Sequence, residues 1–175
     1  LGVQIGYENR VLTLGSCFAA HIARKLAAAK FRVTENPSGI LFNPLSIAAA
    51  IRSYVSPAAV TRDELGFDGE VWYHFGFHGD FSASRRRLSV EEIVKTFAEL
   101  IEGPLAGKQI ILTVSPVRHI GDGLAGNAVS KATLRLAAEE LMQRFKCAAY
   151  FPAYEIVTDD LRDYRFYADD LVHPA

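Results

Sequence analysis

The sequence has few of the residues that mark metal sites, disulfide scaffolds or membrane spans. Two cysteines, one methionine and one tryptophan occur among its 175 residues. Cys17 and Cys147 lack the spacing of metal ligands and form no framework of paired cysteines, so we expect no metal site and a reducing compartment. No apolar run approaches the roughly 18 residues that a membrane span needs, and the N-terminus lacks a secretion-signal pattern. These absences favour a cytoplasmic protein that does not act at a membrane.

An excess of charge of one sign is also lacking. The formal net charge is −1 at pH 7, which argues against broad electrostatic attraction to nucleic acid or to anionic lipid. The basic run Arg85-Arg86-Arg87 stands beside a helix start and is typical of a solvated turn. No phosphate-binding loop pattern is present, and nothing in the sequence implies a cofactor. We therefore expect a small-molecule partner rather than nucleic acid or a membrane.

Half of the residues are hydrophobic, enough for a single domain with a sizeable core over residues 1–175. Short apolar runs alternate with helical patterns, which is the order of elements in a parallel α/β fold. Asn127, after a glycine-rich loop at 121–126, is the expected cap of a long helix. The expected strands are 10–14, 31–35, 109–114 (continuously apolar, hence buried) and 147–151, and the expected helices are 17–30, 45–55, 89–102, 127–145 and 154–161.

An aromatic insertion at about residues 62–82 interrupts this order. Asp68-Gly69 between alternating apolar runs predicts a β-hairpin. The hairpin either covers part of the sheet or sets an aromatic wall over a pocket. His74 and His78 stand four apart, a spacing that brings two metal ligands together on a helix but not on a strand.

The turn Gly15-Ser16-Cys17 lies between the first expected strand and the first expected helix. This arrangement places Ser16 at a helix N-terminus, where α/β enzymes hold nucleophiles and anions. An ordinary serine N-cap fits the same pattern. The residues of this turn alone do not decide between the two interpretations.

A second candidate feature lies near the C-terminus, where Asp170 precedes His173 by three residues. A carboxylate so placed can orient an imidazole and stabilise its protonated form, as in a Ser-His-Asp triad. A serine after the first strand and an Asp-His pair after the last strand would both lie at the carboxyl edge of a parallel sheet.

The turn Gly15-Ser16-Cys17-Phe18-Ala19 resembles the signature of the GSCFA family, which belongs with the SGNH-type, or GDSL-type, hydrolases. The resemblance implies a three-layer α/β/α domain with a mostly parallel, flavodoxin-like sheet, carrying the hairpin as an insertion. It covers most of the chain. The further stretches that are similar to the family pattern are residues 36–40, 113–119, 122–123, 127–132, 150–155, 161–167 and 170–174.

The resemblance also implies roles for individual residues in an esterase or an acyltransferase. Ser16 is the nucleophile, His173 the base and Asp170 its orienting partner. The backbone N–H groups of Gly39 and Ser16 donate hydrogen bonds to the oxyanion. Gly15 and Cys17 flank the nucleophile within the same site. By analogy with the superfamily, the substrate is an ester such as an O-acylated carbohydrate.

The sequence departs from the family pattern in one place. Between the hairpin and the helix at residue 89, we expect a further strand and an Asn-Cys-His stretch that supplies another oxyanion donor, and residues 82–88 hold neither. A closing helix after Pro174 is also expected, so the chain reads as truncated. If the segment is missing from the gene, a binding module without turnover becomes the alternative to an enzyme.

Two further alternatives concern individual residues. Cys17 at a helix start is a candidate nucleophile in place of Ser16. Ser115, Arg118 and His119 follow the strand at 109–114, where they either line the substrate pocket, with Arg118 binding an acidic group bidentately, or brace the loop and the C-terminal tail.

Overall fold

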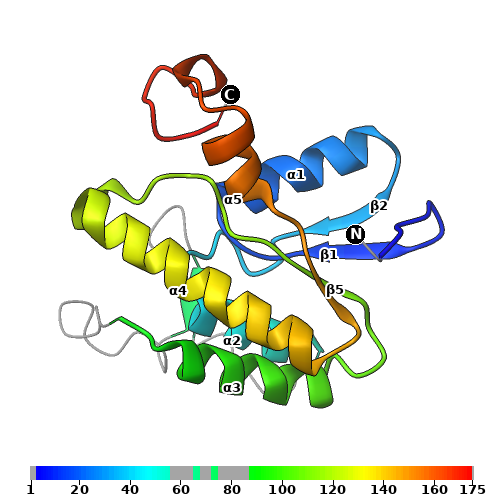
Figure 1. Ribbon diagram of the computed structural model, residues 1–175. Coiled ribbons are helices and arrows are strands. Elements are labelled where there is room, and N and C mark those ends of the chain that lie inside the picture. The colour runs from blue at the N-terminus through cyan, green and yellow to red at the C-terminus, as the bar shows by residue number, and fades with distance from the viewer. Residues whose placement is uncertain (1–2, 56–64, 68–71, 75–86, 175) are drawn as a thin grey trace. The chain divides into compact units, whose positions relative to one another are not determined.

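The computed structural model describes residues 3–55, 65–67, 72–74 and 87–174 (Figure 1). The chain divides into two compact units. The N-terminal unit holds Gln4–Leu88 and Lys95–Ala106, and the C-terminal unit holds Leu1–Val3, Ser89–Val94 and Gly107–Ala175.

The N-terminal unit begins with a strand-helix-strand motif. Strands β1 (Arg10–Thr13) and β2 (Arg32–Glu35) are parallel neighbours, with Val11 opposite Val33. Helix α1 (Cys17–Ala28) connects the two strands (Figure 1). The Arg24 guanidinium pairs with the Glu35 carboxylate at 3.1 Å, which ties the helix to the second strand.

Two capped helices contribute to the core of this unit, the second of them through its residues from Lys95 onward. In α2 (Pro44–Val55), the Asn43 side chain accepts the Ser46 N–H at 2.9 Å, and proline takes the first helical position, where its missing N–H is not needed. Ser89 and Glu92 form a reciprocal capping box at the start of α3 (Val90–Glu102), with hydrogen bonds of 2.9 and 3.1 Å. The buried cluster comprises Ala48, Ile51 and Leu100, with Leu14, Ile47, Phe97 and Leu105 packed against it.

The expected hairpin is confirmed by two short strands. β3 (Leu65–Phe67) and β4 (Trp72–His74) pair antiparallel, with Phe67 opposite Trp72. The Asp68-Gly69 turn, His78 and most of the aromatic insertion lie outside the described residues. Both interpretations of the aromatic side chains therefore stay predictions.

The C-terminal unit repeats the parallel pairing. Strands β5 (Ile110–Leu112) and β6 (Ala148–Tyr150) are parallel neighbours connected through the long helix α4 (Gly123–Arg144). Its core includes Val114, Ala137 and Leu141, each at most 3% exposed. The remaining elements are 3-10 turns at Ile120–Asp122 and Tyr164–Phe166, helix α5 (Ala153–Glu155) and a π turn at Ile156–Asp160.

Two sequence expectations in this unit are wrong. The strand expected to be buried is shorter and half-exposed: Ile111 keeps 39% of its surface, and the described neighbour of β5 is β6 alone. The expected glycine-rich loop at 121–126 and the cap at Asn127 are replaced by helix, because α4 already begins at Gly123. Asn127 instead accepts the His119 N–H at 2.9 Å, so it fastens the preceding loop to the helix.

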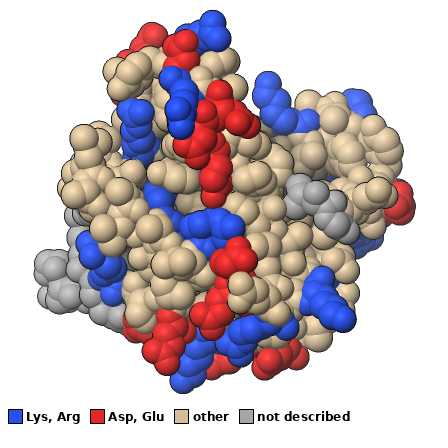
Figure 2. Space-filling model, viewed as in Figure 1, with Lys and Arg blue, Asp and Glu red and all other residues tan. Residues whose placement is uncertain are grey.

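The observed class is mixed α/β with parallel strand pairs, and this agrees with the sequence at that level. On the face shown in Figure 2, basic and acidic side chains are interspersed. Among the described helices, none has the length and apolar character to cross a membrane.

Lys131 of α4 is a buried cation in the C-terminal unit. The residue is 8% exposed, and its Nζ donates to the Ser115 carbonyl oxygen at 2.6 Å. The ammonium also lies 6.0 Å from the centre of the Tyr154 ring. Burial lowers the pKa of Lys131 from 10.5 to about 8, because removal from water disfavours the charged form.

This shift predicts how stability depends on pH. Between pH 8 and 10.5 the unfolded chain binds the Lys131 proton more tightly than the folded chain does, so the free energy of unfolding contributed by this group rises with pH. Lys131→Met should remove that rise from urea-unfolding curves measured across this window. Lys146→Met, at an exposed position, should retain it. Identical pH dependence in wild type and Lys131→Met would contradict the assignment.

Candidate active site

The turn that carries Ser16 requires glycine at residue 15. Gly15 has a φ of +145°, which residues with a side chain rarely adopt, and an added Cβ would lie 3.3 Å from the Ala19 Cβ. The Gly15 N–H donates to Asn36 Oδ1 at 2.9 Å, and its carbonyl oxygen accepts the Leu41 N–H at 2.9 Å. The turn is therefore fixed on both sides by the segment that follows β2.

Ser16 occupies the N-cap position of α1 with extended backbone, φ −71° and ψ −177°. Its carbonyl oxygen accepts the Ala20 N–H at 3.2 Å, which starts the helix. Its side chain makes no capping hydrogen bond to the first turn. The hydroxyl thus does not perform the function that an ordinary serine cap performs.

Cys17 is the first residue of α1 and is half-buried. Both Cys17 and Cys147 are free thiols. Its place next to Ser16 in the turn leaves Cys17 as the alternative nucleophile that the sequence predicts.

Gly39 lies in the segment after β2, in the left-handed conformation with φ +80°. Its N–H donates to the Asn36 carbonyl oxygen at 2.8 Å and closes a four-residue turn. This N–H would have to leave that bond before it could donate to an oxyanion. The amide of Asn36 has a polar atom of its own without a partner, since Nδ2 is buried and unbonded among the described residues.

Asp170 and His173 form a preorganised pair. The His173 Nδ1 lies 2.6 Å from Asp170 Oδ2, within one short hydrogen bond. Asp170 Oδ1 accepts the backbone N–H groups of Val172 at 2.8 Å and of His173 at 3.0 Å. Each carboxylate oxygen thus has a donor, and the imidazole is oriented with Nε2 as its other nitrogen.

These donors act on the charge of Asp170. The backbone N–H of His173, its imidazole and the backbone N–H of Val172, in that order, lower the pKa of the carboxyl from 3.8 to about 2. Both side chains are nearly half-exposed, His173 to 43% and Asp170 to 49%. Asp170 is therefore ionised wherever an esterase would operate, and it can stabilise a protonated imidazole.

The residues after β5 make contacts within the chain. The Ser115 hydroxyl accepts the Val117 N–H at 3.2 Å, and the His119 backbone N–H donates to Asn127. Arg118 donates from its backbone N–H to the Val172 carbonyl oxygen at 3.2 Å and from Nη1 to the Leu171 carbonyl oxygen at 3.0 Å. These contacts match the interpretation in which Arg118 braces the C-terminal tail, rather than the one in which it binds substrate.

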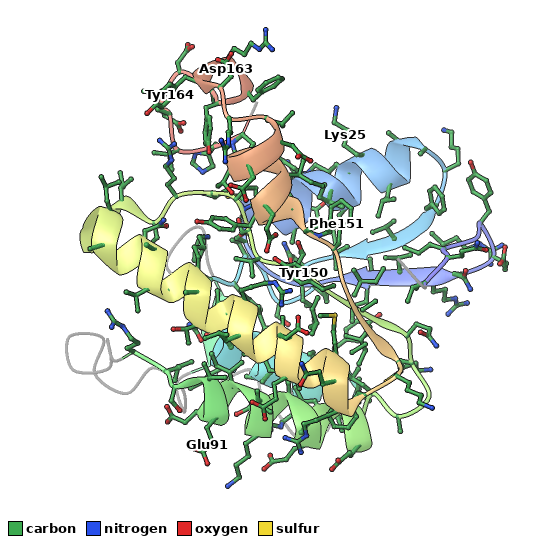
Figure 3. The ribbon with its side chains drawn as sticks, viewed as in Figure 1. Lys25, Glu91, Tyr150, Phe151, Asp163 and Tyr164 are labelled. Carbon is green, nitrogen blue, oxygen red and sulfur yellow. The ribbon has the colours of Figure 1, made fainter. Side chains whose placement is uncertain are left out.

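The stretch at 150–155 contains a polar cluster that sequence reasoning did not identify. The Tyr150 hydroxyl donates to the Glu155 carboxylate at 2.8 Å. Burial, and after it this bond, raises the pKa of Tyr150. The Arg135 guanidinium lies 4.4 Å from the centre of the Tyr150 ring and 3.4 Å from Glu155. Figure 3 labels Tyr150 and Phe151 where β6 ends. The Tyr-x₄-Glu spacing is the sequence feature from which the contact between Tyr150 and Glu155 could be predicted.

The predicted site residues fall into two groups. Gly15, Ser16, Cys17 and Gly39 belong to the N-terminal unit. The C-terminal unit holds Ser115, Arg118, His119, Asp170 and His173. Among the described residues, no three His, Cys, Asp or Glu side chains gather as a metal site.

Comparison with known proteins identifies the family. A model of the GSCFA family matches residues 10–87 and 84–175. The chain belongs to the GSCFA family. The two matched pieces of this GSCFA protein overlap at 84–87, within the stretch where the sequence departs from the expected pattern. The absence of a family segment there stays a prediction. Neither a curated protein nor a solved structure matches the chain.

The geometry of Gly15 predicts a stability effect. Gly15→Ala combines an unfavourable φ with the 3.3 Å contact to Ala19 and should lower the free energy of unfolding by about 3 kcal/mol. Gly107→Ala is the matched control, since Gly107 also has a positive φ (+73°) but nothing lies within 4 Å of the added Cβ. The control should cost about 1 kcal/mol in chemical denaturation. Equal losses would show that the close approach to Ala19 is unimportant.

The donors around Asp170 predict its titration. Carbon-13 NMR should find the carboxyl with a pKa near 2. The stabilisation of the folded loop by ionised Asp170 should be lost as the pH falls from 3.8 through 2. His173→Ala removes the imidazole and keeps the backbone donors, so the pKa should rise only part of the way toward 3.8. A full return to 3.8 would mean that the backbone N–H groups contribute nothing.

Proposed function

We propose that this GSCFA protein is a serine hydrolase of the SGNH type that acts on ester bonds within a three-layer α/β/α domain. Ser16 is the nucleophile, His173 the general base and Asp170 the residue that orients the base. The observation that carries the proposal is the Asp170–His173 pair, with its 2.6 Å hydrogen bond and both carboxylate oxygens bonded.

The reaction follows from these groups. His173 Nε2 takes the Ser16 proton as Oγ attacks the ester carbonyl carbon, and the tetrahedral intermediate places a negative charge on the former carbonyl oxygen. Collapse of the intermediate breaks the bond to the alcohol, which leaves with the proton from His173, and an acyl-enzyme remains. Water, or a sugar hydroxyl in an acyltransferase, then resolves the acyl-enzyme by the same proton transfers.

The N-terminus of α1 is the proposed oxyanion site. The Ser16 N–H lies at the start of this 12-residue helix, where the helix dipole favours negative charge. Gly39 is the second proposed donor, and its bond to the Asn36 carbonyl oxygen would exchange for a bond to the intermediate. The substrate class, O-acyl groups on carbohydrates, is proposed by analogy with the superfamily.

A cytoplasmic location belongs to the same proposal. It rests on the two cysteines, which the structure holds as free thiols.

Substitution of Ser16 tests the proposal directly. Ser16→Ala should lower hydrolysis of a p-nitrophenyl ester by at least about 10³-fold, because both the nucleophile and the acyl-enzyme are lost. A fluorophosphonate should label wild type at Ser16 and leave Ser16→Ala unlabelled. Cys17→Ala is the neighbouring control and should keep both activity and labelling. Loss of activity in Cys17→Ala, with Ser16→Ala still active, would identify Cys17 as the nucleophile.

One observation favours a second function. The Gly39 N–H already has an acceptor within its own turn, and the sequence lacks the stretch expected to supply an asparagine donor. A protein without a working oxyanion hole would bind acylated carbohydrate without turnover. Calorimetry with acylated and deacylated oligosaccharides separates the two, since an enzyme should consume the acylated ligand and a binding module should return it intact.

A further inference from the structure

The loop that carries Asp170 and His173 is closed by backbone hydrogen bonds. The Ala168 N–H donates to the His173 carbonyl oxygen at 2.8 Å, and the Leu171 N–H donates to the Ala168 carbonyl oxygen at 2.9 Å. An isolated antiparallel bridge joins Tyr167 to Pro174 at its base. The result is a small closed loop, residues 168–173, with the imidazole at its end.

Arg118 contacts this loop and the tyrosines that precede it in three ways. Its backbone N–H and its Nη1 donate to the neighbouring carbonyl oxygens of Val172 and Leu171, at 3.2 and 3.0 Å. The Cζ of the same guanidinium lies 4.5 Å from the centre of the Tyr167 ring and 5.7 Å from that of Tyr164. Both tyrosines belong to the C-terminal tail, on which Figure 3 labels Tyr164.

The bond to Leu171 has a specific consequence. Leu171 has a φ of +56°, the left-handed conformation, which is unfavourable for a residue with a side chain. Leu171 is also the residue through which the chain turns between Asp170 and Val172, whose N–H bonds to the carboxylate. The charged Nη1 donor stabilises the Leu171 carbonyl oxygen in this orientation, and a charge-assisted bond is stronger than a neutral one.

We propose that Arg118 is a positioning residue for the Asp170–His173 pair and that it does not bind substrate. The inference rests on the proposed function only for its kinetic consequence. One nitrogen of the guanidinium bonds to the loop, and its Cζ lies 4.5 Å from the centre of the Tyr167 ring. Arg118 fixes the loop conformation that brings the carboxylate to Nδ1, and so it fixes the tautomer in which Nε2 can accept a proton.

The first test measures the imidazole itself and needs no activity. Long-range proton–nitrogen NMR correlations through the carbon-bound ring protons, at about pH 8.5 where an ordinary imidazole is neutral, should show His173 protonated on Nδ1 in wild type. Arg118→Gln should yield a mixture of the two tautomers, and Arg118→Lys, which keeps a charged donor, should restore most of the wild-type pattern. An unchanged tautomer in Arg118→Gln overturns the inference.

The second test separates positioning from substrate binding. With esters of matched leaving group, one neutral and one bearing a carboxylate, Arg118→Gln should lower kcat about 10²-fold on both and leave KM nearly unchanged, as expected for a misplaced catalytic group. A rise in KM confined to the anionic ester would overturn the inference in favour of a substrate ligand. If wild type has no esterase activity, the proposed function fails, and the NMR result still decides the role of Arg118.

Two further variants serve as controls. Arg165→Gln removes an arginine of the same tail that stacks on Phe166 and pairs with Asp163, but that makes no described hydrogen bond to residues 168–173. It should leave the tautomer and kcat unchanged. Tyr167→Leu removes the stacked ring and keeps the Arg118 hydrogen bonds, so it should produce a smaller shift in the same direction, and it replaces Arg118→Gln should that variant fail to fold.

Discussion

A single carboxylate organises the C-terminal tail. Asp170 accepts two backbone N–H groups on one oxygen and an imidazole on the other. Three donors around one anion stabilise its charge, and the same three donors fix the backbone of the loop and the plane of the ring. The orientation of the His173 imidazole and the fold of the loop therefore depend on the same hydrogen bonds, and Arg118 adds a further bond to the loop at Leu171.

The sequence predicts the elements whose causes are local. The strands β1, β2, β5 and β6 and the hairpin at 65–74 follow from hydrophobic period and turn residues that lie within a few positions of one another. The Asp170–His173 contact is local as well, since three residues separate the partners. Membership of the GSCFA family followed from short motifs and is confirmed.

Features that depend on distant partners could not be predicted in this way. The sequence left two interpretations of Arg118 open, because its carbonyl partner lies 53 residues away. Lys131 contacts a carbonyl oxygen 16 residues away, and the local pattern does not show this partner. The bond from the Gly39 N–H to Asn36 depends on the conformation of a turn, which composition allows but does not select. At Asn127, interactions along the helix and with the His119 N–H outweigh the local preference for a cap.

The bond between Gly15 and Asn36 limits which residues can stand at position 36. The amide oxygen of Asn36 is occupied by the Gly15 N–H, while its buried Nδ2 lacks an acceptor among the described residues. An aspartate in its place would bury a second oxygen with no donor and add charge, and an alanine would leave the Gly15 N–H unbonded. The serine turn and the loop after β2 therefore share one contact, and a substitution that removes the Asn36 amide oxygen should disturb both.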